Sequence, residues 1–107
     1  MKIGVFTALL NKLPLAQVLE KLQSLDIHTV ELGTGNYPGD PHCPLSMLTD
    51  RSALREFKQK LDDRGFSISA LSCHGNPLHP NTALAKAFQE TSRKTVRLAQ
   101  DLSLIHI

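Results

Sequence analysis

The sequence is poor in the residues that mark several specialised classes of protein. It has two cysteines, Cys43 and Cys73, no tryptophan and 5% aromatic residues. Two cysteines are too few for the disulfide framework of a small secreted domain. No apolar run approaches the ~18 residues that a membrane helix needs, and the N-terminus lacks the apolar core of a signal peptide. We therefore expect a protein of the reducing cytoplasm with no membrane partner.

The sequence also lacks an excess of either charge. Lys and Arg together number 12 against 10 Asp and Glu, which leaves a formal net charge of +2. A disordered chain combines high net charge with low hydrophobicity, whereas hydrophobic residues make up 41% of this sequence. A charge this small does not imply a nucleic-acid partner. We expect a globular domain with no nucleic-acid partner.

What the sequence does contain is an alternation of strand and helix patterns. Apolar runs rich in β-forming residues predict short strands at 3–6, 29–32 and 66–73. A helix pattern follows each strand, and this alternation favours a parallel α/β sheet with right-handed crossovers. Ligands of such sheets collect at the carboxyl ends of the strands. The segments that follow the strands are therefore the ones to search for a site.

Proline, glycine and candidate N-cap residues set the expected limits of the helices and loops. Pro14 suits a first helical turn, and Asp50 and Asn81 are candidate N-caps. Gly65 is expected to end the second helix. Glycine and proline are dense between residues 33 and 49, which predicts a long loop without regular structure.

Each expected helix has an apolar face and a polar face. The cations of the third helix are expected to form a solvated outer surface. These cations are Lys86, Arg93, Lys94 and Arg97. The residues expected on buried faces recur at three- and four-residue spacing. They are Leu15, Val18, Leu19, Leu22 and Leu25 in the first helix, Leu54, Phe57 and Leu61 in the second, and Leu84, Phe88, Thr91, Thr95, Leu98 and Leu102 in the third.

The last residues, 102–107, resemble a foreign addition. One DNA sequence that encodes them is similar to the transposon mosaic end used as a sequencing-library adapter. The alternative is that Leu102 and Leu104 are natural helix residues. We expect residues 102–107 to be a non-native, adapter-derived tail, and we exclude them, His106 included, from reasoning about the fold.

Four stretches of the sequence resemble a known enzyme family. They are Met1-Lys2-Ile3-Gly4-Val5-Phe6-Thr7, Val30-Glu31-Leu32-Gly33-Thr34-Gly35, Tyr37-Pro38-Gly39-Asp40-Pro41-His42-Cys43 and, most distinctively, Leu71-Ser72-Cys73-His74-Gly75-Asn76-Pro77-Leu78-His79-Pro80. With these stretches, residues 1 to 101 resemble the sugar phosphate isomerase/epimerase family, the xylose isomerase-like branch of TIM barrels.

This resemblance implies both a fold and a cofactor. The fold is α/β, and residues 1–101 would be the first three βα units of a (β/α)8 TIM barrel, truncated from a parent of ~250 residues. Members of the family typically bind a divalent metal (Mn, Mg, Co or Zn) through residues of later strands. No metal ligand can therefore be assigned to this sequence. The resemblance leaves a homo-oligomeric parent open.

Two residues are candidates for catalysis at the ends of the expected strands. His74 follows the third strand, and histidine both donates protons to sugar oxygens and binds metals near neutral pH. Glu31 ends the second strand, where a carboxylate among apolar residues needs a partner. It is expected either to hold His74, to receive a substrate hydroxyl, or to act as a structural charge partner.

Two residues of the loop after the third strand are candidates for substrate binding. Asn76 offers both a donor and an acceptor to sugar hydroxyls. His79 either contacts substrate or packs the loop. A zinc site built from the histidines and cysteines is disfavoured, because the sequence has neither CxxC nor HxxxH spacing.

The sequence therefore favours one function and leaves two alternatives. We expect the N-terminal part of a metal-dependent sugar or sugar phosphate isomerase or epimerase, inactive without the rest of the enzyme. The first alternative is a metal-dependent nuclease of the endonuclease IV type. The second is a small non-enzymatic α/β binding module.

Overall fold

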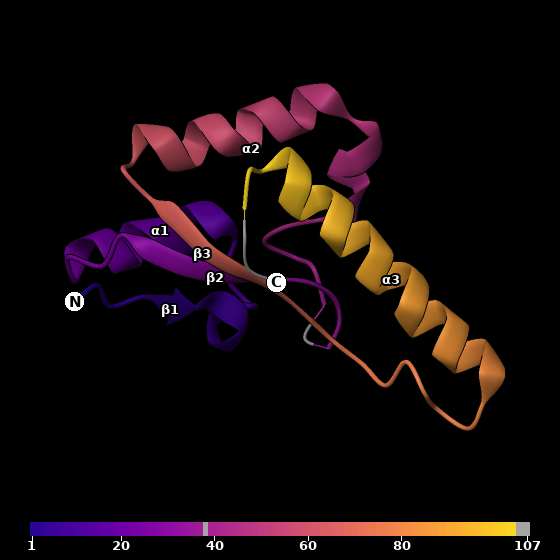
Figure 1. Cartoon of the computed structure of the whole chain (residues 1–107). Coiled ribbons are helices and arrows are strands. Elements are labelled where there is room, and N and C mark those ends of the chain that lie inside the picture. The colour runs from indigo at the N-terminus through magenta and orange to yellow at the C-terminus, as the bar shows by residue number, and fades with distance from the viewer. Residues whose placement is uncertain (38, 105–107) are drawn as a thin grey trace.

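The chain forms an open parallel sheet whose strands lie in sequence order (Figure 1). The computed structural model describes residues 1–37 and 39–104. The sheet has three strands, β1 (Val5–Phe6), β2 (Thr29–Asn36) and β3 (Ser67–His74). Both neighbouring pairs are parallel, as the alternation of strands and helices predicts.

The expected α-helices are present with the expected start signals. They are α1 (Leu15–Ser24), α2 (Arg51–Asp63) and α3 (Thr82–Asp101). Asp50 caps α2 by accepting a hydrogen bond from the Ala53 N–H. Asn81 caps α3 by accepting from the two amides at its start, those of Ala83 and Leu84. Both N-caps predicted from the sequence are confirmed.

The region from residue 33 to residue 49 has more regular structure than expected. β2 continues past Gly33 to Asn36, and a 3-10 helix, η2 (Leu45–Thr49), precedes α2. A second 3-10 helix, η1 (Thr7–Leu10), follows β1. The prediction of a loop is therefore wrong at both ends of this region. Glycines did not end β2 because its pairing with β3 tolerates an irregularity between Gly33 and Gly35.

The sheet has one buried face and one open face. Val30 and Leu32 of β2 and Leu71 of β3 are fully buried and point toward the helices. Side chains alternate along a strand, so Glu31, between Val30 and Leu32, points to the opposite face. The register places Phe6 and Ala70 beside Glu31 on that open face.

All α-helices contribute to one core on the buried face of the sheet. Figure 1 shows α3 running back from the loop after β3 toward α2. The core combines side chains of these helices with those of the strands and of η2. Its buried members are Val18, Leu19, Leu22, Val30, Leu32, Cys43, Met47, Leu54, Phe57, Leu61, Phe66, Leu71, Leu98, Ala99 and Leu102.

The buried face of α3 differs from the prediction at its first turn. Thr95 and Leu98 are buried as expected, but Leu84 is 44% exposed and Ala85 is buried instead. The first turns of α3 extend beyond the end of the sheet (Figure 1). A large apolar residue there has no sheet beneath it to contact.

The prediction that the chain forms the first three βα units of a TIM barrel is wrong. The structure is a small compact α/β arrangement of a three-strand parallel sheet and three α-helices, with a Cα radius of gyration of 14.1 Å. Its sheet is open, with β1 at one edge and β3 at the other. The alternation of strands and helices determines that neighbouring strands are parallel, but closure of a sheet also depends on strand number, tilt and stagger.

Two further expectations concern the membrane and the tail. Among residues 1–37 and 39–104, no helix combines the length and the apolar character needed to cross a membrane. Leu102 is buried in the core and Leu104 packs against it. The foreign origin of residues 102–107 stays a prediction, and residues 105–107 of that tail lie outside the described residues.

Candidate functional site

The open face of the sheet contains a polar concavity. The α-helices supply their buried residues to the core on the other face, so strand residues line this hollow. Its volume is about 790 Å³. The lining residues are Lys2, Gly4, Val5, Phe6, Thr29, Glu31, Ser67 and Ser69.

Glu31 is held in place on this face by a neighbouring strand. The Ser72 hydroxyl donates a hydrogen bond to the Glu31 carboxylate, and Ser72 is itself buried. Glu31 is the third residue of β2 rather than its last, which corrects the predicted strand end. The hydrogen bond fixes one carboxylate oxygen, and a carboxylate offers further lone pairs to a bound hydroxyl.

His74 ends β3, as the sequence predicted, and its side chain is exposed. Its backbone is fixed by Tyr37, because the Tyr37 N–H donates to the His74 carbonyl at 3.1 Å and the reverse bond measures 3.3 Å. The rings of His74 and Phe6 have centroids 6.5 Å apart. Phe6 is also the register partner of Glu31, so it neighbours both candidate catalytic residues on the open face.

The two candidate substrate-binding residues lie apart from Glu31, in the turn that leads to α3. The Asn76 Oδ1 accepts from the Leu78 N–H at 3.0 Å. The His79 Nδ1 accepts from the Asn81 N–H at 3.0 Å, and the His79 ring lies 6.4 Å from that of Phe88. Both residues shape the turn, and their contact with substrate stays a prediction.

A buried histidine was missed by the sequence reasoning. His42 is 3% exposed. Its Nε2 lies 2.7 Å from the Leu13 carbonyl oxygen and its Nδ1 lies 2.9 Å from the Thr7 Oγ1. A carbonyl only accepts, so Nε2–H is the donor to Leu13. When the ring is neutral, Nδ1 carries no proton and accepts from the Thr7 hydroxyl. The sequence offered no signal for this contact, since Thr7 and His42 are brought together only by the fold.

The two cysteines differ in their surroundings. Burial, with a smaller effect from the Asp40 charge, raises the pKa of the Cys43 thiol to about 12. Cys73 is only partly buried, and its Sγ accepts from the Asn36 Nδ2 at 3.2 Å. Within the described part of the chain, no three His, Cys, Asp or Glu side chains are grouped closely enough to bind a metal ion.

Comparison with known proteins gives one related sequence of unknown activity. No protein-family model matches the chain. Over 100 residues the chain is 38% identical to the uncharacterized protein YfiH of Bacillus subtilis (strain 168). The match covers 92% of this chain and 32% of YfiH, so the chain spans about a third of the length of that relative.

Proposed function

We propose that this chain supplies part of the substrate site of a cytoplasmic sugar or sugar phosphate isomerase or epimerase. The observation that carries the proposal is the set of groups on the open sheet face. The Ser72 hydroxyl orients the Glu31 carboxylate. Phe6 is paired with Glu31 in the register of β1 and β2, and its ring lies near the exposed imidazole of His74. A carboxylate, an imidazole and an apolar ring are the groups that bind the hydroxyls and the C–H surface of a sugar.

The proposed chemistry is a proton transfer next to a carbonyl. A base removes the proton from the carbon beside the carbonyl. Delivery of that proton to the former carbonyl carbon, with transfer of the hydroxyl proton to the former carbonyl oxygen, isomerises the sugar. Delivery to the opposite face of the same carbon epimerises it. Glu31 accepts a hydrogen bond from a substrate hydroxyl and orients the sugar. His74 donates a hydrogen bond to a substrate oxygen and so helps Glu31 to orient the sugar.

The described residues do not fit a divalent metal, because they bring no suitable group of ligating side chains together. We therefore assign these residues to binding and orientation of the sugar. We propose that the 107-residue chain binds sugars without turning them over. Turnover of a ketose by this chain in the presence of Mn²⁺ or Mg²⁺ would show that its own residues suffice for catalysis.

A titration with sugars tests the proposed site. Backbone amide signals of the chain are followed by NMR while a ketose, and separately its phosphate ester, is added. We expect shifts at β1, at Glu31 and at His74, and weaker binding in Glu31→Gln and His74→Asn. Glu20→Gln, an exposed change on α1, is the matched control. Equal binding by all variants, or shifts elsewhere only, contradicts the proposal.

A non-enzymatic binding module is the second candidate, favoured by the continuous core formed by the described residues. Both candidates predict sugar binding by the chain. The two candidates differ in the activity expected of a longer protein that contains this sequence. An enzyme would interconvert ketose and aldose, whereas a binding module would not.

A further inference from the structure

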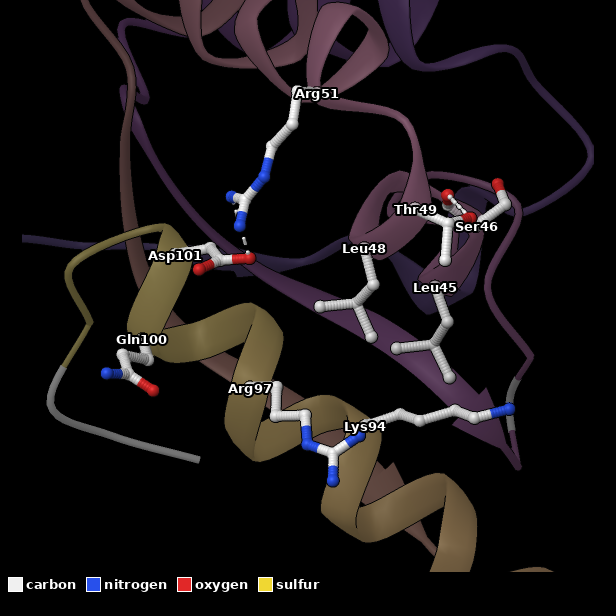
Figure 2. Close-up of a pocket in the computed structure, with 9 residues that line it drawn as sticks. All are labelled: Leu45, Ser46, Leu48, Thr49, Arg51, Lys94, Arg97, Gln100 and Asp101. Carbon is white, nitrogen blue, oxygen red and sulfur yellow. Dashed lines mark hydrogen bonds and ion pairs between the residues drawn. The ribbon is translucent and has the colours of Figure 1, made fainter.

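A second concavity lies on the helix side of the molecule, between η2 and α3. Its volume is about 500 Å³. Figure 2 shows side chains from η2, from the start of α2 and from α3 around it. The lining residues are Leu45, Ser46, Leu48, Thr49, Arg51, Lys94, Arg97, Gln100 and Asp101.

The wall of this cavity is positively charged. Its lining includes three cations, Arg51, Lys94 and Arg97, and one carboxylate, that of Asp101. The Arg51 Nη1 lies 3.2 Å from the Asp101 Oδ2, so these two groups form an ion pair. Within the described residues, Lys94 and Arg97 have no ion-pair partner. Two positive charges in the lining of this cavity are therefore not neutralised by an ion pair with any described residue.

The positions of the cations on α3 account for this concentration. Lys94, Arg97 and Asp101 share one helix face, since residues three and four apart are neighbours on a helix. Two other cations of α3, Lys86 and Arg93, are not among the lining residues, and Arg93 lies 3.8 Å from Glu90. Lys94 and Arg97 are exposed, as predicted for the cations of this helix, and they also line the cavity.

The remaining lining residues combine hydroxyl and apolar groups. The Thr49 hydroxyl donates to the Ser46 carbonyl at 3.2 Å and leaves its oxygen free to accept. Leu45 and Leu48 are half-buried and pack against the core. Figure 2 shows both leucine side chains directed toward α3. The cavity thus joins two uncompensated cations to an apolar wall.

We propose that this cavity is a binding site for a small organic phosphate monoester. A phosphate dianion matches the two uncompensated charges. The planar guanidinium of Arg97 donates two parallel hydrogen bonds to phosphate oxygens, and Lys94 adds a point charge. The organic group of the ester contacts Leu45 and Leu48. The site is separate from the open sheet face and does not rest on the function proposed there.

The test uses phenyl phosphate as the probe, with inorganic phosphate, benzoate and benzyl alcohol as comparisons. Amide signals of the chain are followed by NMR at low salt. We expect phenyl phosphate to shift signals of η2 and of α3 from residue 94 to residue 101. We expect inorganic phosphate and benzoate to bind more weakly than phenyl phosphate, and benzyl alcohol not to bind. Added NaCl is expected to weaken the binding of each anion, because salt screens the charges.

Matched substitutions on α3 decide whether the cavity is responsible. Lys94→Gln and Arg97→Gln are each expected to weaken phenyl phosphate binding about tenfold, because each removes a charged hydrogen-bond donor. Arg97→Lys keeps the charge and recovers only part of the loss. Lys86→Gln and Arg93→Gln remove the same charge outside the cavity and leave binding unchanged.

Three results would overturn the proposal. The first is an equal loss of affinity in the variants inside the cavity, at residues 94 and 97, and in those outside it, at residues 86 and 93. This result would indicate general attraction of anions to a cationic chain. The second is benzoate binding as tightly as phenyl phosphate, which removes the phosphate class. The third is shifts confined to other elements. All substituted side chains are exposed, so thermal unfolding of each variant is expected to match that of the parent chain.

Discussion

Among residues 1–37 and 39–104, every buried side-chain polar atom has a hydrogen-bond partner, and the contact between Thr7 and His42 allows the contribution of one such bond to be measured. Thr7 is fully buried and its hydroxyl donates to the His42 Nδ1. Thr7→Val keeps the shape of the side chain and removes the donor. We expect a loss of about 1–3 kcal/mol in the free energy of unfolding, because a buried acceptor is left without a partner. Urea unfolding measures this loss.

Thr7→Ser is the control for that prediction. It retains the hydroxyl, removes one methyl group and is expected to cost less than Thr7→Val. If Thr7→Val unfolds at the urea concentration of the parent chain, the hydrogen bond to His42 contributes nothing to stability.

The two thiols are expected to react at different rates. Cys43 is fully buried and the pKa of its thiol is raised to about 12, whereas Cys73 is partly exposed. Only the thiolate reacts with iodoacetamide. At pH 8 we expect Cys73 to be alkylated first and Cys43 only as fast as the chain unfolds. Peptide mass spectrometry identifies the modified residue, and rapid alkylation of Cys43 in the folded chain would contradict its burial.

The same pKa predicts how stability changes at high pH. The unfolded thiol titrates near 9 and the folded thiol near 12. Between these values the folded state holds a proton that the unfolded state has released, so stability falls as pH rises. The slope is at most about 1.4 kcal/mol per pH unit. Cys43→Ala removes this contribution, and urea unfolding of both proteins from pH 8 to pH 11 compares the slopes.

At the scale of an element, β2 depends on Gly35. Its φ of +147° lies in a region that L side chains rarely adopt, and a Cβ there would lie 2.6 Å from the Thr91 Cγ2. Gly35→Ala therefore combines backbone strain with a clash against α3. We expect a loss of about 2–4 kcal/mol in the free energy of unfolding. Thermal unfolding reports this loss as a lowered Tm.

A second substitution separates the two causes. Thr91→Ser deletes the clashing methyl group and keeps the hydroxyl that donates to the Ala87 carbonyl. Gly35→Ala combined with Thr91→Ser is expected to recover part of the lost stability, and the backbone strain accounts for the rest. No recovery would mean that the clash does not contribute.

Elements were predicted best where one short signal determines them. Asp50 and Asn81 each bond to amides within three residues, so local sequence is sufficient to find them. β2 was predicted to end at Gly33, yet it reaches Asn36 because β3 offers a partner strand along its whole length. Pairing between segments about 38 residues apart is not visible in a local pattern.

The candidate sites show the same division. His74 was found because the end of a strand is a recognisable position. The Ser72 bond to Glu31, the Thr7 bond to His42 and the cavity beside Lys94 each join different elements. These contacts depend on how strands and helices pack, which the residue types alone do not determine. The same limit explains the wrong prediction of a barrel. The strand–helix alternation is compatible with an open sheet, as observed, and equally with a closed barrel.

At the scale of the whole molecule, one core connects every α-helix with the sheet. Leu71 is fully buried within it, and its strand contacts both β2 and α3. Leu71→Ala is expected to cost about 2–5 kcal/mol in the free energy of unfolding. Because the core is continuous and includes Val18, Leu19 and Leu22 of α1, this loss should also reach α1. Leu9→Ala, at a residue that is 89% exposed, is the control.

Amide hydrogen exchange distinguishes a single cooperative unit from separate parts. In one unit, the slowest amides of α1, β2 and α3 exchange through the same global opening, and Leu71→Ala accelerates all of them by the same factor. In a chain whose parts open independently, acceleration is confined to β3 and its neighbours, and α1 keeps its protection. The continuous core supports the first outcome, and on the open face Thr29 Oγ1 lies 3.3 Å from Ser67 Oγ, which joins β2 to β3. Unchanged protection of α1 in Leu71→Ala would show that the core is divided and that the sheet does not stabilise the first helix.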